Sequence, residues 1–231
     1  MRPALHWPQR PPEPADLPGA DEIHLRQTDL DERVARAEPL WDALSLAEQE
    51  RARRFVFEEH RRRYVSARTW LRSVLGAYLD LPPRDVPLAL NTRGKPHIAA
   101  DTKRAGLQFN LSHCDRFALL AVAAQREIGI DLQEPLRDGT WPAIAERICT
   151  PAEQQHIQTL PPETQARAFV EIWTRKEAAG KATGEGLTAR IFSLAVGPAA
   201  WGTVDCGGGL SVWSLRFPDR FAAAIAVRKP D

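Results

Sequence analysis

Two short frames, almost half a chain length apart, constrain the fold more than any other feature of this sequence. "SLAE" at 45–48 and "TPAE" at 150–153 both have the hydroxyl and glutamate spacing of a helix-starting capping box, 105 positions apart. Downstream, "LRSVLG" at 71–76 and "RKEAAG" at 175–180 each come after a tryptophan and end in a glycine, at an offset of 104. Two matches at nearly one offset predict two related subdomains in the 231 residues.

Hydrophobic patterning predicts the same mixture of strand and helix in both halves. Apolar residues at three- and four-residue steps from His60 predict a long helix that ends before Pro82, and Thr150 begins a second helix. Strand-like runs occupy 21–30, 86–98, 107–125, 127–133, 188–197, 209–217 and 220–228. The expected fold is α+β: two halves, each a small antiparallel sheet packed on a long helix, and a site formed jointly by the halves would lie in the cleft between them.

The chain divides into three parts on this interpretation. Residues 1–20 form a Pro-rich N-terminal arm, expected to be loose or extended; 21–125 and 126–231 are the N-terminal and C-terminal subdomains. The arm lacks the apolar core of a secretory signal, and no apolar run approaches the roughly 18 residues of a membrane helix. The three widely spaced cysteines fit a reducing compartment, so a cytoplasmic protein with no membrane partner is expected.

Charge argues against a nucleic-acid partner. Lys and Arg total 31 against 30 Asp and Glu, a net charge of +1. The arginines cluster locally instead, at positions 51, 53, 54, 61, 62, 63, 68 and 72. Such a cluster is either a solvated helix face or a binding site for a small polyphosphate, whose oxygens suit the planar guanidinium.

Three segments carry residues that could do chemistry. In "EIWTRKEAAGKATGEGL", Trp173, Glu177 and Lys181 recur every four residues, so they share one helix face, although an isolated Glu-Lys ladder would be only a solvated surface. In "FNLSHC", Ser112 and His113 lie at a strand end but lack the pattern of a serine hydrolase. In "GIDLQ", Asp131 and Gln133 would point to one face of a strand, where Asp131 is either structural or a Mg²⁺ ligand.

Taken together, these motifs resemble the 4′-phosphopantetheinyl transferases, specifically the two-domain type named after the surfactin synthetase activator. That family has G-[IV]-D-x-E followed some forty residues later by W-x-x-K-E-[AS]-x-x-K, which stand here as "GIDLQ" and "WTRKEAAGK". "RGKPHI", "FNLSHC" and the "RRF" register also fit, so the resemblance runs from about Ser45 to Leu187. It implies transfer of 4′-phosphopantetheine from coenzyme A to a serine of an acyl or peptidyl carrier protein, with release of adenosine 3′,5′-bisphosphate. It also implies two pseudo-two-fold-related α+β subdomains with the active site in the cleft between them, in agreement with the repeat.

The resemblance also implies a role for each matching residue. Asp131 and Glu177 would bind Mg²⁺, Glu177 would accept the serine proton, and Lys181 would stabilise the pyrophosphate, so these three are the expected catalytic residues. The expected coenzyme A contacts are Lys181 and Lys176 at the phosphates, Ser112 and His113 beside them, Gly94, Lys95 and Pro96 at the adenine, and Arg51 and Arg63 at the ribose 3′-phosphate.

Gln133 departs from the family pattern, which usually has Glu there. It could bind the metal as a neutral third ligand, be replaced by water, or mark an impaired enzyme. A catalytically silent coenzyme A-binding homologue is therefore the main alternative to a Mg²⁺-dependent holo-carrier-protein synthase. Because both halves of the site lie in one chain, a monomer is expected. The motifs do not identify the carrier, which by analogy belongs to polyketide, peptide or fatty-acid synthesis.

Overall fold

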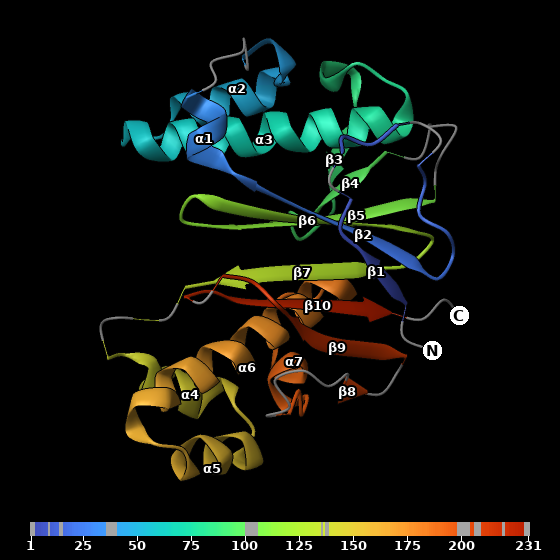
Figure 1. The fold of residues 1–231 in the computed structure, drawn as a ribbon. Helices are drawn as coiled ribbons and strands as arrows, with labels where there is room; N and C mark the ends of the chain where they lie inside the picture. Colours follow the sequence, from blue (N-terminus) through green and yellow to red (C-terminus); the bar gives the residue numbers. More distant parts are fainter. Residues whose placement is uncertain are drawn as a thin grey trace.

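The computed structural model describes residues 3–8, 10–13, 16–35, 41–99, 106–134, 136, 139–197, 204–205, 209–218 and 220–228. Two four-stranded sheets lie face to face, with helices on the outer side of each (Figure 1). The shared core between the sheets contains Ile23 and Leu25 from one sheet and Ile130 and Ile225 from the other. This arrangement is the α+β fold that the repeat predicts.

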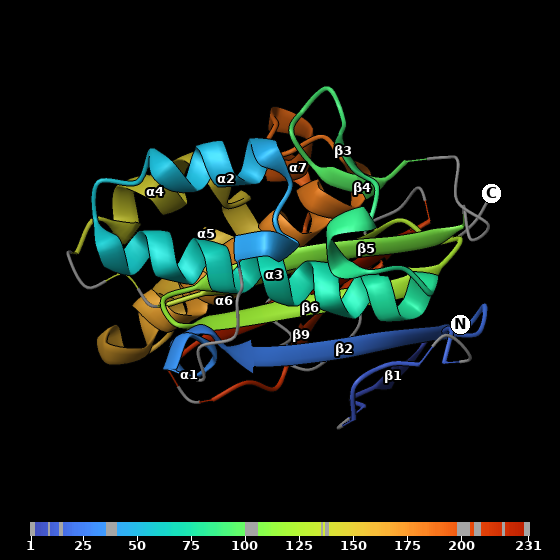
Figure 2. The same cartoon turned by 90° about the horizontal axis from the view of Figure 1, so that it is seen from above.

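The first sheet has the strand order β1-β2-β6-β5. Its strands are β1 (Ala4–His6), β2 (Glu22–Asp29), β5 (Leu107–Cys114) and β6 (Phe117–Ala124). The helices α1 (Leu30–Ala35), α2 (Leu46–Arg53) and α3 (Glu58–Leu79) lie above it, and α3 crosses the sheet in the view from above (Figure 2). A hairpin of β3 (Leu88–Leu90) and β4 (Pro96–Ile98) follows, and short 3₁₀ turns occupy Trp41–Ala43 and Pro83–Asp85.

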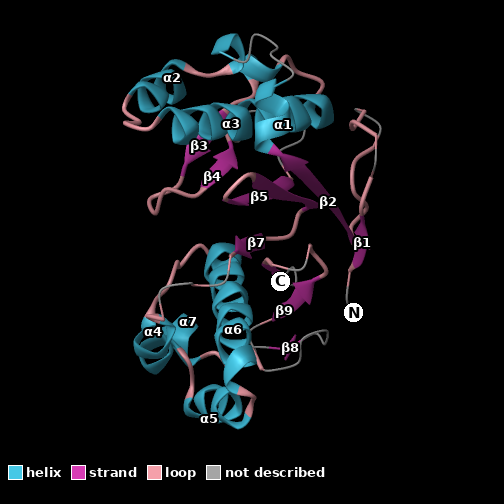
Figure 3. Cartoon of the chain, turned by 60° about the vertical axis from the view of Figure 1, so that its left-hand side comes forward, coloured by secondary structure: helices cyan, strands magenta, loops and turns pink. Residues whose placement is uncertain are grey.

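The second sheet has the order β7-β10-β9-β8. Its strands are β7 (Ile128–Gln133), β8 (Val204–Asp205), β9 (Leu210–Leu215) and β10 (Ala222–Arg228). The helices are α4 (Trp141–Ile148), α5 (Pro151–Thr159), α6 (Pro162–Thr183) and α7 (Ala189–Ser193). The long helix α6 stands beneath β7, on the face away from the first sheet (Figure 3). Within the described residues no helix is both long and apolar enough to cross a membrane.

Both predicted capping boxes are present. The side chains of Ser45 and Thr150 accept from the backbone N–H of Glu48 and Glu153, and each glutamate side chain accepts from the backbone of its capping residue. These reciprocal bonds satisfy donors that a helix start would otherwise leave unpaired, which explains why α2 and α5 begin where they do.

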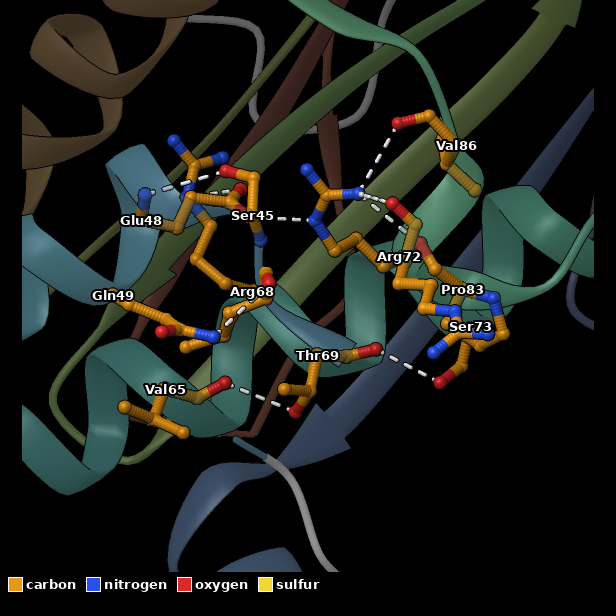
Figure 4. A network of polar contacts seen from close by, with 12 residues as sticks. Ser45, Glu48, Gln49, Val65, Arg68, Thr69, Arg72, Ser73, Pro83 and Val86 are labelled. Carbon is orange, nitrogen blue, oxygen red and sulfur yellow. Dashed lines mark hydrogen bonds and ion pairs between the residues drawn. The ribbon is translucent and has the colours of Figure 1, made fainter. Parts of the chain in front are cut away.

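Each capping glutamate also pairs with a buried cation on the long helix of its half. Glu48 Oε2 is 2.6 Å from Arg72 Nε (Figure 4), and Glu153 Oε2 is 2.9 Å from Lys176 Nζ. Arg72 further donates to the carbonyls of Pro83, Arg84 and Val86, while Lys176 donates to those of Phe192 and Leu194. In both halves, the same kind of buried ion pair therefore connects the short helix, the long helix and the segment that follows the long helix.

Several predicted elements differ from the structure. Residues 54–57 interrupt the first helical stretch, because Phe57 is extended and caps α3 without a side-chain bond. The strand predicted over 188–197 is instead the short helix α7, whose start Thr188 caps. The arm is also more ordered than expected, since Ala4–His6 form the parallel edge strand β1 beside β2. Cys149 is buried and Cys114 half-buried, while Cys206 lies outside the described residues.

Glycines mark the places where backbone meets backbone. A side chain at Gly76 would bring a Cβ within 2.6 Å of Leu81 O, and one at Gly180 within 2.6 Å of Gly186 O. Gly129, in "GIDLQ", is the tightest, since its Cβ would lie 2.1 Å from Ala178 O and 2.4 Å from Ala182 N. Gly129 thereby lets β7 approach α6 closely, which brings the next outward-facing residue, Asp131, to the helix.

Gly129→Ala should lower the free energy of unfolding by roughly 3 kcal/mol, because a methyl group would have to displace helix backbone. Gly106→Ala is a matched control: its nearest contact is the flexible Gln125 side chain, with Cγ at 3.0 Å, so the expected change is within about 0.5 kcal/mol. Urea denaturation of both variants measures the difference. Equal losses would contradict the role of close strand-helix approach.

Candidate active site

Side chains rather than a backbone ladder join the two sheets where β5 and β7 lie side by side. Asn110 Oδ1 accepts from Ile130 N at 2.8 Å, and Ser112 Oγ accepts from Leu132 N at 3.2 Å. Both side chains come from β5 and bond alternate amides of β7. The amides that an edge strand would otherwise leave unpaired are thus satisfied across the two halves.

This junction places a buried carboxylate beneath a lysine. Asp131 is 1% exposed, and its Oδ1 lies 2.5 Å from Lys181 Nζ and 3.0 Å from Ser112 Oγ. Lys181 also donates to Ser112 Oγ and to the Ile130 carbonyl, each at 3.2 Å. Asp131, Lys181 and Ser112, predicted from three separate motifs, therefore meet at one point.

Glu177 is the second carboxylate at this point, one helical turn before Lys181 on α6. Burial raises the pKa of Glu177, the negative charge of Asp131 raises it further, and Lys181 opposes both. A carboxylate whose pKa is raised in this way accepts a proton more readily than a solvated one, which suits a general base.

Gln133 lies beside Asp131 on the same face of β7. Its Nε2 donates to Asp131 Oδ2 at 3.0 Å. If the amide rotated by half a turn, its carbonyl oxygen would take the place of Nε2 beside Asp131 and could act as a neutral metal ligand. Gln133 therefore orients the Asp131 carboxylate in the structure, and its carbonyl oxygen could serve as an uncharged metal ligand.

The donor set fits Mg²⁺, which prefers oxygen ligands and often takes only one or two carboxylates from the protein. Among the described residues, no three His, Cys, Asp or Glu side chains gather as a metal cluster. The protein would thus supply Asp131 and Glu177, whose mutual repulsion a divalent cation would relieve.

His113 follows Ser112 on β5, where adjacent residues point to opposite faces of the strand, yet it lies close enough to Lys181 for that charge to act on it. Desolvation lowers the pKa of His113, although the residue keeps an exposed side, and the charges of Lys181, Arg68 and Arg51 lower it further. His113 therefore lies in a positive field in which its neutral form is favoured.

Lys176 does not reach the cleft, so the predicted phosphate contact is wrong. The side chain is fully buried, and its ammonium is occupied by Glu153 and by the carbonyls of Phe192 and Leu194. Adjacent helix positions point about 100° apart, so Lys176 enters the core of the C-terminal half while Glu177 faces β7.

Arg63, predicted at the ribose 3′-phosphate, is paired with carboxylates of the protein in the structure. Its guanidinium donates to both oxygens of Asp31 at 2.8 Å, and it pairs with Glu59 at 2.8 Å and Asp115 at 2.9 Å. Hydrogen bonds to Asp31 raise the pKa of Arg63, followed by the charges of its acidic partners. Asp115 also pairs with Arg220 at 2.7 Å, so Arg63 belongs to an ion-pair network that links the two halves.

The "RGKP" turn makes hydrogen bonds to the C-terminal end of α6 and to the residues that follow it. Lys95 Nζ donates to Lys181 O at 2.6 Å and to Ile128 O at 3.0 Å, and Arg93 donates to Glu185 O. Lys95 and Pro96 line a cavity of about 290 Å³, whereas Gly94 lies at the exposed tip with a φ of +80°. Burial lowers the pKa of Lys95, whose charge is directed at backbone carbonyls.

Asn110 is a residue of the junction to which the sequence motifs assign no role. It stands in the quoted "FNLSHC" segment, two residues before Ser112, so period-two spacing placed both on one strand face. That spacing was the available signal, but it gave no indication that the partner would be the β7 backbone.

Comparison with known proteins gives a consistent result for both halves. A sequence profile described as "4'-phosphopantetheinyl transferase, N-terminal" matches residues 35–125. A second profile, described as "4'-phosphopantetheinyl transferase superfamily", matches residues 127–225.

Individual relatives are similar over long stretches. The chain is 37% identical over 222 residues to 4′-phosphopantetheinyl transferase HetI of Nostoc sp., covering 96% of this chain and 93% of that protein. It is 31% identical over 154 residues to 4′-phosphopantetheinyl transferase of Bacillus subtilis, covering 67% and 66%. It is 32% identical over 149 residues to human L-aminoadipate-semialdehyde dehydrogenase-phosphopantetheinyl transferase, covering 61% and 48%.

The raised pKa of Glu177 predicts a pH-dependent cost to folding in the protein free of metal and coenzyme. The folded state binds the proton more tightly than the unfolded state, so stability falls as pH rises from about 4.5, the ordinary pKa of a glutamate, through the raised pKa. Glu177→Gln should therefore raise the melting temperature at neutral pH more than at pH values near 4. Thermal unfolding of the wild type and the variant across this pH range measures the difference in melting temperature. An equal rise in melting temperature near pH 4 and at neutral pH would contradict the prediction.

Proposed function

The chain belongs to the 4′-phosphopantetheinyl transferase superfamily and transfers 4′-phosphopantetheine from coenzyme A to carrier proteins, and we propose that this transfer takes place between β5, β7 and α6. The main support for this location of the reaction is the buried Asp131 carboxylate, which contacts Lys181 and Ser112 at the junction of the two halves. Glu177 lies one helical turn before Lys181 on α6, within range of the charge of Asp131.

In the proposed reaction, the hydroxyl of a carrier serine attacks the β-phosphorus of coenzyme A. An oxygen–phosphorus bond forms to the serine, the bond to the adenosine-side phosphate breaks, and adenosine 3′,5′-bisphosphate leaves. Glu177 accepts the hydroxyl proton, directly or through water. Lys181 stabilises the negative charge on the pyrophosphate, and Ser112 and Asp131 hold the Lys181 ammonium in place.

Asp131 and Glu177 would hold Mg²⁺, with Gln133 or a water as a neutral further ligand. When bound, the ion supplies charge neutralisation for the pyrophosphate. His113 would contact the phosphates from the β5 side, while Lys95 and Pro96 would border the adenine.

The sequence left a silent coenzyme A-binding homologue as the alternative. Similarity to a relative named as a transferase over 96% of the chain supports the enzyme instead. We further propose a monomer, because the N-terminal half supplies Ser112 and the C-terminal half supplies Asp131 and Lys181 within one chain. A cytoplasmic location is proposed separately, from the three widely spaced cysteines.

The direct test is incubation with an apo carrier protein, coenzyme A and Mg²⁺. We expect a mass gain of one phosphopantetheine group on the carrier serine. Glu177→Gln should lower kcat by about 10²- to 10⁴-fold, the usual contribution of a positioned base. Glu171→Gln, on the same helix but paired with Arg167, is the control and should keep activity. A fully active Glu177→Gln variant would remove the proposed role of Glu177.

Gln133 allows a test of metal binding that does not depend on turnover. With one carboxylate fewer than the family pattern, the coenzyme-free protein should bind Mg²⁺ weakly, and coenzyme A should strengthen binding by adding phosphate ligands. Gln133→Glu should strengthen binding without coenzyme A. Calorimetric titration with Mg²⁺ measures the affinity of the wild type without coenzyme A, of the wild type with coenzyme A, and of Gln133→Glu without coenzyme A. Tight binding to the coenzyme-free wild type would contradict the expectation.

A further inference from the structure

A buried arginine on β2 has only neutral partners among the described residues. Arg26 is 8% exposed, its Nε donates to the Tyr78 hydroxyl at 3.2 Å, and its Nη1 donates to the Arg10 carbonyl at 2.7 Å. Arg72, a buried arginine of α3, differs because it pairs with the carboxylate of Glu48. Within the described chain no carboxylate forms an ion pair with Arg26. A buried cation without a counter-ion costs free energy, so Arg26 stands where an anion would be stabilised.

The charge of Arg26 acts on His24, which lies two residues earlier on the same face of β2. The Nδ1 atom of His24 is 2.8 Å from the Tyr78 hydroxyl, so one phenol contacts both side chains. Burial lowers the pKa of His24 most, and the charge of Arg26 lowers it further. Glu22 and Asp16 oppose this change, each by less than Arg26 contributes. Neither carboxylate therefore cancels the positive field of Arg26.

Arg26 lines a cavity of about 510 Å³ that lies between β2, α3 and the N-terminal arm. Arg10 and Arg33 line it too, and no Asp or Glu of the described residues does. Trp7 from the arm and Trp70 from α3 supply aromatic surface. β1 carries the arm along the edge of the first sheet, beside β2 (Figure 2). Apolar walls with a few polar groups, at this volume, are typical of small-molecule sites.

The arm occupies the Arg26 guanidinium only through a backbone carbonyl. The guanidinium of Arg10 itself is paired with Glu13 at 2.9 Å and with Asp16 at 2.8 Å. The two hydrogen bonds of Arg26 within the described chain use two of the five N–H donors of a guanidinium. A hydrogen bond to an anion is about twice as strong as one to a neutral carbonyl. An anion in the cavity would therefore bond Arg26 beside the carbonyl or in its place.

We infer that Arg26 is the anion-binding residue of a second ligand site, which takes a small organic anion. The phosphate or carboxylate group of this ligand bonds the Arg26 guanidinium, and its aromatic body packs against Trp7 and Trp70. The site is separate from the catalytic cleft, because β2, α3 and the arm line it, whereas Asp131 and Lys181 lie on β7 and α6. A bound ligand would join the arm to the sheet.

The test uses phenyl phosphate as the probe, with inorganic phosphate and phenol as its two halves. Calorimetric titration of the full chain, with and without saturating coenzyme A and Mg²⁺, should give the same affinity for phenyl phosphate. Inorganic phosphate and phenol should each bind at least about tenfold more weakly. Arg26→Met should weaken phenyl phosphate binding by about tenfold or more, the loss expected for a hydrogen bond to a charged group. Transfer to a carrier protein should stay within about twofold of the wild type.

Two further variants separate the parts of the proposed site. Trp7→Leu should weaken binding of phenyl phosphate but not of inorganic phosphate, because only the first has a ring. Arg84→Met is the matched control, because Arg84 is an exposed arginine of the same half, 3.8 Å from Asp85 and outside the cavity. It should leave both affinities unchanged.

NMR of the indole N–H groups locates the probe in the wild type, so the test does not depend on the folding of Arg26→Met. Phenyl phosphate should shift the signals of Trp7 and Trp70 and leave that of Trp173, on α6, unchanged. Absence of binding, displacement of the probe by coenzyme A, or a shift of Trp173 alone would overturn the inference. So would an Arg26→Met variant that unfolds at the wild-type temperature and binds phenyl phosphate with wild-type affinity.

Discussion

The structure depends on a junction at which two strands lie side by side but are joined by side chains. Had β5 and β7 formed an ordinary ladder, Ser112 would have no backbone amide to hold, and Asp131 would lie in a continuous sheet. Instead, Asn110 and Ser112 bond the amides of β7, and the same Ser112 hydroxyl contacts Asp131 and Lys181. The contact that holds the halves together thus also builds the site, so the geometry of the cleft and the stability of the interface cannot vary independently.

A second constraint is the use of the capping glutamates as counter-ions. Removing one member of a buried pair leaves the other charge uncompensated, which costs about 3–5 kcal/mol. The pairs Glu48–Arg72 and Glu153–Lys176 therefore fix the angle to which each long helix is turned about its own axis. On α6 this rotation decides that Glu177, and not its neighbour Lys176, faces β7.

The repeat, the helix starts and the meeting of Asp131 with Lys181 were predictable, because capping signals and motif spacing are local and each residue's face follows from the period of its element. The roles of Lys176 and Arg63 were not, since both depend on acids distant in sequence: Glu153 for the first, Asp31 and Asp115 for the second. The helix at 189–193 was taken for a strand because a short apolar run with one hydroxyl cap fits both periods. Whether Gln133 binds a metal depends on an amide orientation that no sequence pattern specifies.

The edge strand β1 has a consequence for symmetry. The offsets of the repeat place Arg26, Ser73 and Ala77 where the other half has Asp131, Glu177 and Lys181. These residues line a cavity of about 510 Å³ that Trp7, Pro8 and Arg10 of the arm border, and Arg26 donates to the Arg10 carbonyl at 2.7 Å. β1 lies parallel to β2 there, beside the strand that corresponds to β7. The repeat therefore places two corresponding grooves in the molecule, but of the two sets of corresponding positions only the set in the C-terminal half holds carboxylates, and the arm lines the other groove.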